Sequence, residues 1–230
     1  KAILVGENFL GNSNIGDYKA FYTYNSPNHQ FCLNKNIFNI NKGIINYWFQ
    51  PALELTTKYG DYKPIFSIVN FDSMNILFGL FFSITTKQLI LKLINQFNNI
   101  NFFNIGGQIE LGQNYFISLE YKIGTASPYT LGSWRAYLNG NLIWEKLDFN
   151  WNDTWFNIPI INYNDNNTRQ FCINATGLGY QIPCIIGELS YFNNKNFSDL
   201  PFTHADIYNN GNGVAIIKPA DVVEQSQLKI

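Results

Sequence analysis

Hydrophobic and polar residues along this chain follow the short, punctuated pattern of β-strands. Aromatic and β-branched runs of four to nine residues are separated by Asn, Gly and Asp, which favour turns. Strands are predicted at residues 18–24, 43–50, 64–70, 76–84, 88–94, 102–105, 115–123, 134–138, 141–146, 155–161 and 185–192. Because no helical crossover separates them, this pattern predicts an all-β, antiparallel sandwich or barrel.

The clearest secondary-structure signal is in the segment SWRAYLNGNLIWEK, residues 133–146. Its central Asn139-Gly140 pair predicts a hairpin with a type I′ turn, in which both central residues have positive φ. In the first strand, alternation places Trp134, Ala136 and Leu138 on one face and Arg135 and Tyr137 on the other. In the return strand it places Leu142 and Trp144 on one face and Ile143 on the other. Both faces carry apolar bulk, so the ribbon is predicted to be scaffold and not an open binding platform.

Helical signals are nearly absent. One short helix is predicted after Ser198, which would act as the N-cap with Asp199 ahead of the segment LPFTHADIY. The length suits one sandwich, so residues 1–217 are predicted to be a single domain and the polar residues 218–230 a C-terminal edge strand or connector. The longest apolar run, residues 76–84, is too short to cross a bilayer, and no membrane insertion is predicted.

Several segments follow one another in a recognisable order. KGIINYWFQPA (42–52) places a Gly before an apolar strand that ends at Pro, and LGQNYFISLEYKI (111–123) introduces a long strand with Gly-x-x-aromatic. WRAYLNGNLI (134–143) is a hairpin, and GELSYFNNKNFSD (187–199) a closing strand with a short helix. In this order the segments resemble the concanavalin A-like, laminin-G-like jelly-roll superfamily. The resemblance implies a two-sheet antiparallel jelly-roll sandwich with a concave face.

Members of that superfamily include sugar-binding lectins, adhesion modules, glycoside hydrolases, and tail-fibre or capsid domains of viruses. The resemblance therefore narrows the function only weakly, because one fold hosts many functions. Members of the superfamily often carry one calcium ion at the rim of the sandwich, so the resemblance allows calcium there; no other cofactor is expected.

The composition argues against nucleic acid as a partner. Charged residues make up 13% of the chain, against about 25% in typical domains, and the net charge is −1. The chain has two arginines, Arg135 and Arg169, and no cluster of Lys and Arg. Nucleic-acid binding is therefore not expected, since it depends on clustered cations.

The three cysteines are Cys32, Cys172 and Cys184. They lack the Cys-x-x-Cys spacing of zinc sites, so a zinc ion is not expected. Cys172 and Cys184 flank a turn-like segment, and both a disulfide between them and three buried thiols stay open at this stage.

Catalytic patterns are missing from the sequence. A glycosidase needs two carboxylates about 5–9.5 Å apart, but Glu120 and Glu188 each stand alone in their strands. His29 and His204 have no partner acid pattern, and each is predicted to be a surface residue. No catalytic residue is assigned, and the chain is predicted not to be an enzyme.

The densest group of aromatic and oxygen-bearing side chains lies in DFNWNDTW (148–155) and NYNDNNT (162–168). Aromatic rings stack on the apolar faces of sugars, while Asn and Asp pair with hydroxyls, so the predicted carbohydrate contacts are Trp151, Asn152, Asp153, Trp155, Tyr163 and Asn166. Calcium takes several oxygen ligands, for which the candidates are Asp148, Asp153 and Asp165. Solvated loops, and burial of Trp155 in a strand, are the alternatives.

Together these observations predict a non-catalytic binding module that recognises carbohydrate. Its partner would be a glycan or protein on a cell surface, and its location extracellular or on a virion. A structural or assembly domain of a virus particle or tail fibre is the first alternative, either as a homo-oligomer or within a larger multidomain chain. A glycoside hydrolase or lyase of the same fold is the second.

Overall fold

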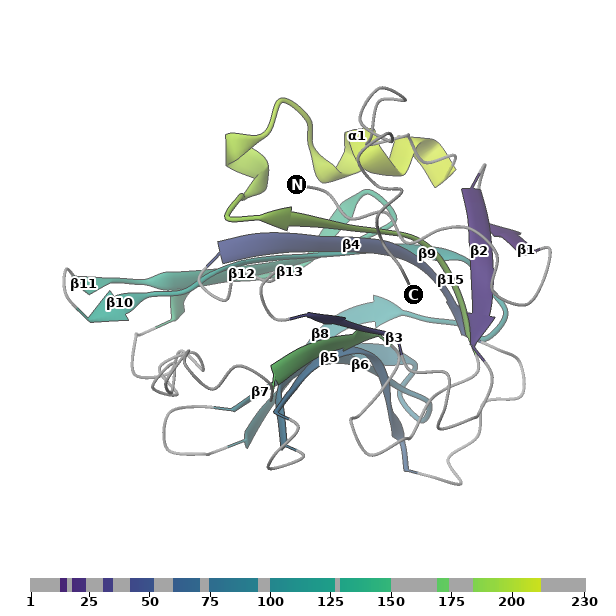
Figure 1. The fold of residues 1–230 in the computed structure, drawn as a ribbon, viewed down its shortest axis with the longest axis horizontal. Helices are drawn as coiled ribbons and strands as arrows, with labels where there is room; N and C mark the ends of the chain where they lie inside the picture. Colours follow the sequence, from purple (N-terminus) through teal and green to yellow (C-terminus); the bar gives the residue numbers. More distant parts are fainter. Residues whose placement is uncertain are drawn as a thin grey trace.

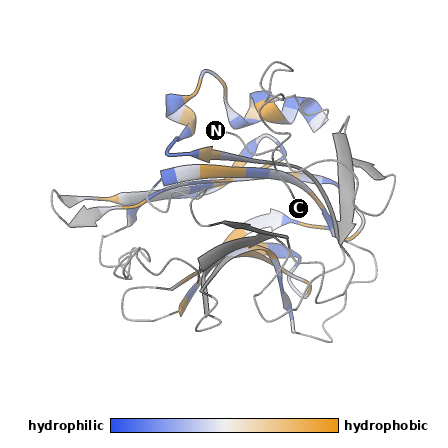
Figure 2. Ribbon diagram, viewed as in Figure 1, coloured by the Kyte–Doolittle hydropathy of each residue, from blue (hydrophilic) through white to orange (hydrophobic). Residues whose placement is uncertain are grey.

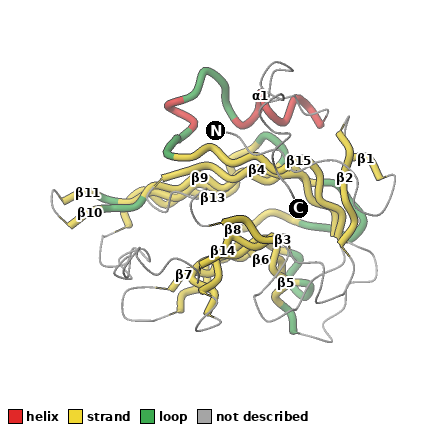
Figure 3. Tube along the Cα trace, in the orientation of Figure 1, coloured by secondary structure: helices red, strands yellow, loops and turns green. Residues whose placement is uncertain are grey.

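The strands of the protein form two stacked layers (Figure 1 and Figure 3). The structure, a computed structural model, describes residues 13–15, 18–23, 31–34, 42–51, 60–70, 75–94, 100–126, 129–149, 169–173 and 184–211. The larger layer is a seven-stranded sheet with the spatial order β1 (Ser13–Ile15), β2 (Tyr18–Thr23), β15 (Cys184–Asn193), β4 (Lys42–Pro51), β9 (Tyr115–Lys122), β12 (Gly132–Leu138) and β13 (Asn141–Phe149).

The second layer is a six-stranded sheet. Its order is β3 (Phe31–Asn34), β14 (Arg169–Ile173), β5 (Tyr62–Asn70), β6 (Asn75–Ser83), β7 (Gln88–Ile94) and β8 (Ile100–Gln108), and a separate two-stranded sheet joins β10 (Thr125–Ala126) to β11 (Tyr129–Thr130). Every strand pairing in the described residues is antiparallel. The predicted fold class, an all-β two-sheet antiparallel sandwich, is confirmed.

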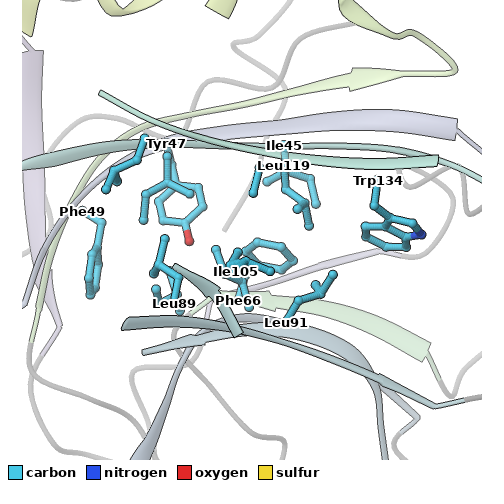
Figure 4. Packing of buried hydrophobic residues seen from close by; sticks show 14 of the residues in the cluster. Ile45, Tyr47, Phe49, Phe66, Leu89, Leu91, Ile105, Leu119 and Trp134 are labelled. Carbon is cyan, nitrogen blue, oxygen red and sulfur yellow. The ribbon is translucent and has the colours of Figure 1, made fainter. Parts of the chain in front are cut away.

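The hydrophobic core lies between the two sheets. Alternate side chains point into it, as the period of two in a strand requires: Ile45, Tyr47 and Phe49 from β4, and Leu89, Leu91 and Leu93 from β7. Figure 4 shows side chains of the two layers meeting, and the Tyr47 ring contacts the Phe66 ring edge-on with centroids 6.0 Å apart. Figure 2 shows hydrophobic and hydrophilic residues interspersed along the described strands.

The ribbon at residues 133–146 forms β12 and β13 and their connecting turn. Asn139 and Gly140 have φ of 48° and 85°, which confirms the predicted turn with two positive φ angles. Trp134, Ala136 and Leu138 are buried in the core, as predicted. That face of the ribbon is therefore part of the core and is not available to a ligand.

The return strand differs from the prediction because it contains a β-bulge. Ala136 pairs with Trp144 but Tyr137 pairs with Leu142, so Ile143 is an extra residue on β13. Trp144 consequently packs against the core, while Leu142 is exposed, and the predicted common face for these two residues is wrong. The Trp144 ring also contacts Phe103 of β8, with centroids 5.9 Å apart, where the edge strands of the two sheets meet.

The segment after β15 covers the outer face of the seven-stranded sheet (Figure 1). It contains two 3₁₀ turns, η4 (Phe197–Asp199) and η5 (Asn209–Gly211), and the helix α1 (His204–Tyr208). The predicted N-cap Ser198 is wrong: it lies inside η4, and Thr203 caps α1 in a capping box with Asp206. Leu200 is extended, as expected for a residue before proline, and separates the two turns.

Most strand predictions match a described strand within a few residues, and the hairpin between β6 and β7 is present. The short strands β1, β3, β10, β11 and β14 were not anticipated, because two to five residues give little periodic signal. The predicted strand 155–161 and the tail 218–230 lie outside the described residues. None of the helices in the described part of the chain is long and apolar enough to cross a membrane.

The cysteines are distributed over both sheets. Cys172 in β14 lies directly opposite Cys32 in β3, in the six-stranded sheet. Cys184 begins β15 in the other sheet, where it pairs with Thr23 and Pro51. The backbone of Cys172 is therefore beside Cys32, and Cys172 and Cys184 do not face each other across one hairpin.

Candidate functional site

Of the loop residues predicted to bind carbohydrate or calcium, the structure describes Asp148. Its carboxylate is exposed and forms an ion pair of 2.9 Å with Lys146, which lowers the pKa of Asp148. Across the described ranges, no three His, Cys, Asp or Glu side chains are grouped so that they could hold a metal ion. The other predicted residues, Trp151, Asn152, Asp153, Trp155, Tyr163, Asp165 and Asn166, lie outside the described residues, so both loop sites stay predictions.

Glu120 is a buried carboxylate on the seven-stranded sheet. Glu120 of β9 accepts hydrogen bonds from the Tyr137 hydroxyl and the Phe197 backbone N–H, both at 3.2 Å. The Arg135 guanidinium lies 3.6 Å from Glu120 and donates a 2.6 Å hydrogen bond to Glu145. Burial, together with the negative charge of Glu120, raises the pKa of Tyr137. These contacts tie Glu120 to β12 and η4, which is the role of a structural anchor.

His204 is also buried on this face, and its predicted surface position is wrong. Its ring is 2% exposed and stacks on Phe116 and Tyr137, with centroids 5.1 and 5.0 Å away. The Gly140 backbone N–H donates to Nε2 at 3.0 Å, so Nε2 carries no proton. The proton is therefore on Nδ1, which donates to the Ser118 hydroxyl at 2.5 Å.

The hydrogen-bond chain from His204 continues through the sheet. The Ser118 hydroxyl donates to the side-chain oxygen of Asn46, whose amide group donates to Ser190 at 3.3 Å. Burial lowers the pKa of His204 to about 3. His204 is therefore neutral, and both of its ring nitrogens are hydrogen-bonded. Its role is structural, because these bonds hold α1 against the seven-stranded sheet.

The outer face of the six-stranded sheet has a different character. In β7 the residues Leu89, Leu91 and Leu93 face the core, so Lys92 lies on the outer face. Phe102 of β8 pairs directly with Lys92 and shares that face.

Two aromatic rings lie stacked and exposed on this face. The ring of Tyr62, at the start of β5, stacks on Phe102 with centroids 5.4 Å apart and an interplanar angle of 25°. Tyr62 is 47% exposed and Phe102 50%, whereas core aromatics such as Phe66 are fully buried. The Lys92 amine lies 6.0 Å from the centre of the Phe102 ring. We call Tyr62, Lys92 and Phe102 the aromatic patch.

Amide groups border the aromatic patch. Asn104 is two residues from Phe102 on β8, and its amide donates to the Gln88 side chain. The Asn104 oxygen accepts the Gly106 backbone N–H at 2.9 Å, which fixes the orientation of the amide. The apolar residue Ile100, 51% exposed, continues the patch at the other end of β8. The arrangement combines flat apolar surface with oriented hydrogen-bonding groups.

Comparison with known proteins gives a fold likeness only. No protein-family model matches the chain, and no curated protein matches its sequence. Among solved structures, the CBM40 of a Ruminococcus gnavus IT-sialidase bound to α2,3 sialyllactose is 11% identical with a TM-score of 0.53, over 79% of this chain and 93% of that chain.

Two further structures have similar scores. An endo-β-1,4-glucuronan lyase from the fungus Trichoderma reesei is 11% identical with a TM-score of 0.50, over 86% of this chain and 89% of that chain. The receptor-binding domain of a botulinum neurotoxin mosaic serotype C/D is 12% identical with a TM-score of 0.52, over 91% of this chain and 45% of that chain. At these identities the likeness concerns the β-sandwich fold and is consistent with a jelly roll.

Proposed function

We propose that this protein is a non-catalytic carbohydrate-binding module of the concanavalin A-like, laminin-G-like kind, and that it contacts its ligand through the aromatic patch. The observation that supports this proposal most strongly is the stacked, exposed pair of Tyr62 and Phe102. Large apolar surface that is left in contact with water, next to oriented polar groups, marks an interaction site.

The chemistry of a sugar matches both parts of the aromatic patch. The C–H groups on one face of a pyranose ring make an apolar plane that packs on an aromatic ring and removes both from water. Hydroxyl groups at the edge of the sugar can pair with the amides of Gln88 and Asn104. The proposal is also supported by the likeness in fold to a CBM40 that was solved with sialyllactose bound, in which a similar sandwich binds a sugar.

The proposal places the protein on an extracellular or virion surface, where it meets glycans of a cell. It assigns no catalytic role to Glu120, because Tyr137, Phe197 and Arg135 already engage its carboxylate. The loops with Trp151 and Asp165 stay a second predicted contact region.

A glycan array followed by titration calorimetry tests the proposal. Truncating an aromatic anchor in a binding site costs about 2 kcal/mol, so Phe102→Ala and Tyr62→Ala are each expected to weaken binding at least tenfold. Leu142→Ala is the matched control, because Leu142 is equally exposed but lies on the other sheet. Absence of binding to every glycan on the array would remove the proposal. Loss of binding on Trp151→Ala alone would move the site to the predicted loops.

A further inference from the structure

Lys92 forms no ion pair with an acidic side chain in the described residues, whereas Lys42, Lys87, Lys146 and Arg135 each form one. It is nevertheless partly buried, and this burial lowers the pKa of its amine. Within the described residues, Lys92 is therefore a partly dehydrated cation with no carboxylate paired to it.

The acidic groups around the aromatic patch have other partners. Asp61, beside Tyr62, accepts hydrogen bonds from the Ser83 hydroxyl at 2.6 Å and the Thr85 backbone N–H at 2.7 Å. Burial alone would raise the pKa of Asp61, but these hydrogen bonds outweigh it and hold the pKa below its usual range. Glu110 is paired with Lys87 at 2.5 Å. The positive charge of Lys92 is thus not cancelled within the patch.

Removing an ammonium group from water costs free energy unless a partner of opposite charge replaces the water. The Phe102 ring offsets part of this cost, because a cation near an aromatic face is attracted to it. A ligand carboxylate would offset more, through a hydrogen bond in which both partners are charged.

We propose that the aromatic patch selects acidic glycans, whose carboxylate pairs with the Lys92 amine while the sugar ring stacks on Phe102. This inference rests on the proposed carbohydrate binding and adds its ligand class: uronic or sialic acid residues. The cation and the ring act on one sugar because Lys92 and Phe102 are directly paired on neighbouring strands.

Two matched pairs of ligands test the charge separately from the sugar. Oligoglucuronate is compared with its carboxyl-reduced, neutral counterpart, and sialyllactose with lactose, by titration calorimetry. The wild-type protein is expected to bind the acidic member of at least one pair tenfold or more tighter, with a preference that shrinks as salt rises from 20 to about 500 mM.

Three variants test whether the preference for acidic ligands comes from Lys92. Lys92→Gln is expected to remove the preference while neutral binding is kept, and Lys92→Arg to retain it. Phe102→Ala is expected to weaken binding of both members of a pair. Lys122→Gln, which changes an exposed lysine on the other sheet, is the control and is expected to have no effect.

The two possible failures are distinguishable. Equal binding of acidic and neutral ligands, or a preference that survives Lys92→Gln, overturns the inference and leaves carbohydrate binding intact. Absence of binding to all four ligands and to the glycan array overturns the proposed function together with this inference. Circular dichroism of each variant separates loss of binding from loss of fold.

Discussion

The backbone N–H of Gly140 donates a hydrogen bond to Nε2 of His204, 3.0 Å away and 64 positions later in the chain. This contact joins the β12–β13 turn to helix α1. Gly140 also lies against Tyr208: a Cβ at residue 140 would be 2.9 Å from Cδ1 of that ring. The turn therefore contacts α1 at both its first residue, His204, and its last residue, Tyr208, which lie on one face of the helix.

The first prediction concerns the pH dependence of stability. The pKa of His204 is lowered from 6.5 to about 3 by burial. Between these two values the unfolded chain binds a proton at residue 204 that the folded chain does not bind. The free energy of unfolding is therefore expected to fall as pH falls through this window, by up to about 1.4 kcal/mol per pH unit from this residue.

Urea unfolding at several pH values from 7.5 to 4 measures this effect. Above pH 6.5 the residue is neutral in both states, and its contribution is constant. The variant His204→Gln is expected to show a shallower slope below pH 6.5. Identical slopes in the two proteins would show that the ring takes up a proton in the folded state.

The second prediction separates two costs of adding a methyl group at a glycine. Gly140→Ala places Ala at φ 85° and against the Tyr208 ring, whereas Gly60→Ala places it at φ 94° in open space. The conformational cost alone is about 1–2 kcal/mol. Thermal or urea unfolding is expected to show a larger loss for Gly140→Ala. Equal losses would mean that Tyr208 moves aside freely.

The third prediction separates binding from folding in two phenylalanines. Phe66 is fully buried in the core, and Phe66→Ala is expected to cost about 3–5 kcal/mol of unfolding free energy. Phe102 is half exposed, and Phe102→Ala is expected to cost about 1 kcal/mol or less. Urea titrations of both variants make the comparison. A loss at Phe102 as large as at Phe66 would identify its ring as a structural residue.

The fourth prediction tests the register of β3 and β14. Directly opposite residues of antiparallel strands have Cα atoms about 4.5–5.5 Å apart, within the range that a disulfide spans. Air oxidation catalysed by copper phenanthroline removes two electrons and two protons from a thiol pair, with oxygen as the oxidant. Peptide mapping by mass spectrometry is expected to find Cys32 linked to Cys172, and Cys172→Ser to abolish the link. A Cys172–Cys184 product would contradict the register.

Alternation and turn chemistry were sufficient to predict most of the fold. The Asn139-Gly140 turn and the buried Trp134, Ala136 and Leu138 follow from local rules that involve one hairpin. The bulge at Ile143 does not, because it depends on how β13 packs on the core. The cap at Thr203 was missed although its signal is local, in the Thr203-x-x-Asp206 capping box two residues after Pro201. His204 was misplaced because its burial depends on a sheet distant in sequence.

The aromatic patch was harder to predict because its rings come from strands that are not neighbours. Tyr62 lies on β5 and Phe102 on β8, with β6 and β7 between them. A usable signal existed within β7, where the lysine of QLILKLI alternates with leucines and marks the outer face. Without the strand order, nothing in the sequence associates that lysine with Phe102 or with Tyr62.

The extra residue on β13 has a consequence for how this chain can change in length. Ile143 stands opposite no residue of β12, so its removal would leave Trp144 opposite Ala136 and make the pairing regular at this point. Leu142, Trp144 and Glu145 would keep the faces they now have. A deletion at Glu145, by contrast, would move Lys146 from its place opposite Trp134 to one opposite Arg135 and so reverse its face. Length changes in β13 are therefore tolerated best at its two irregular points, at Ile143 and between Lys146 and Phe149, where inward and outward faces are not exchanged.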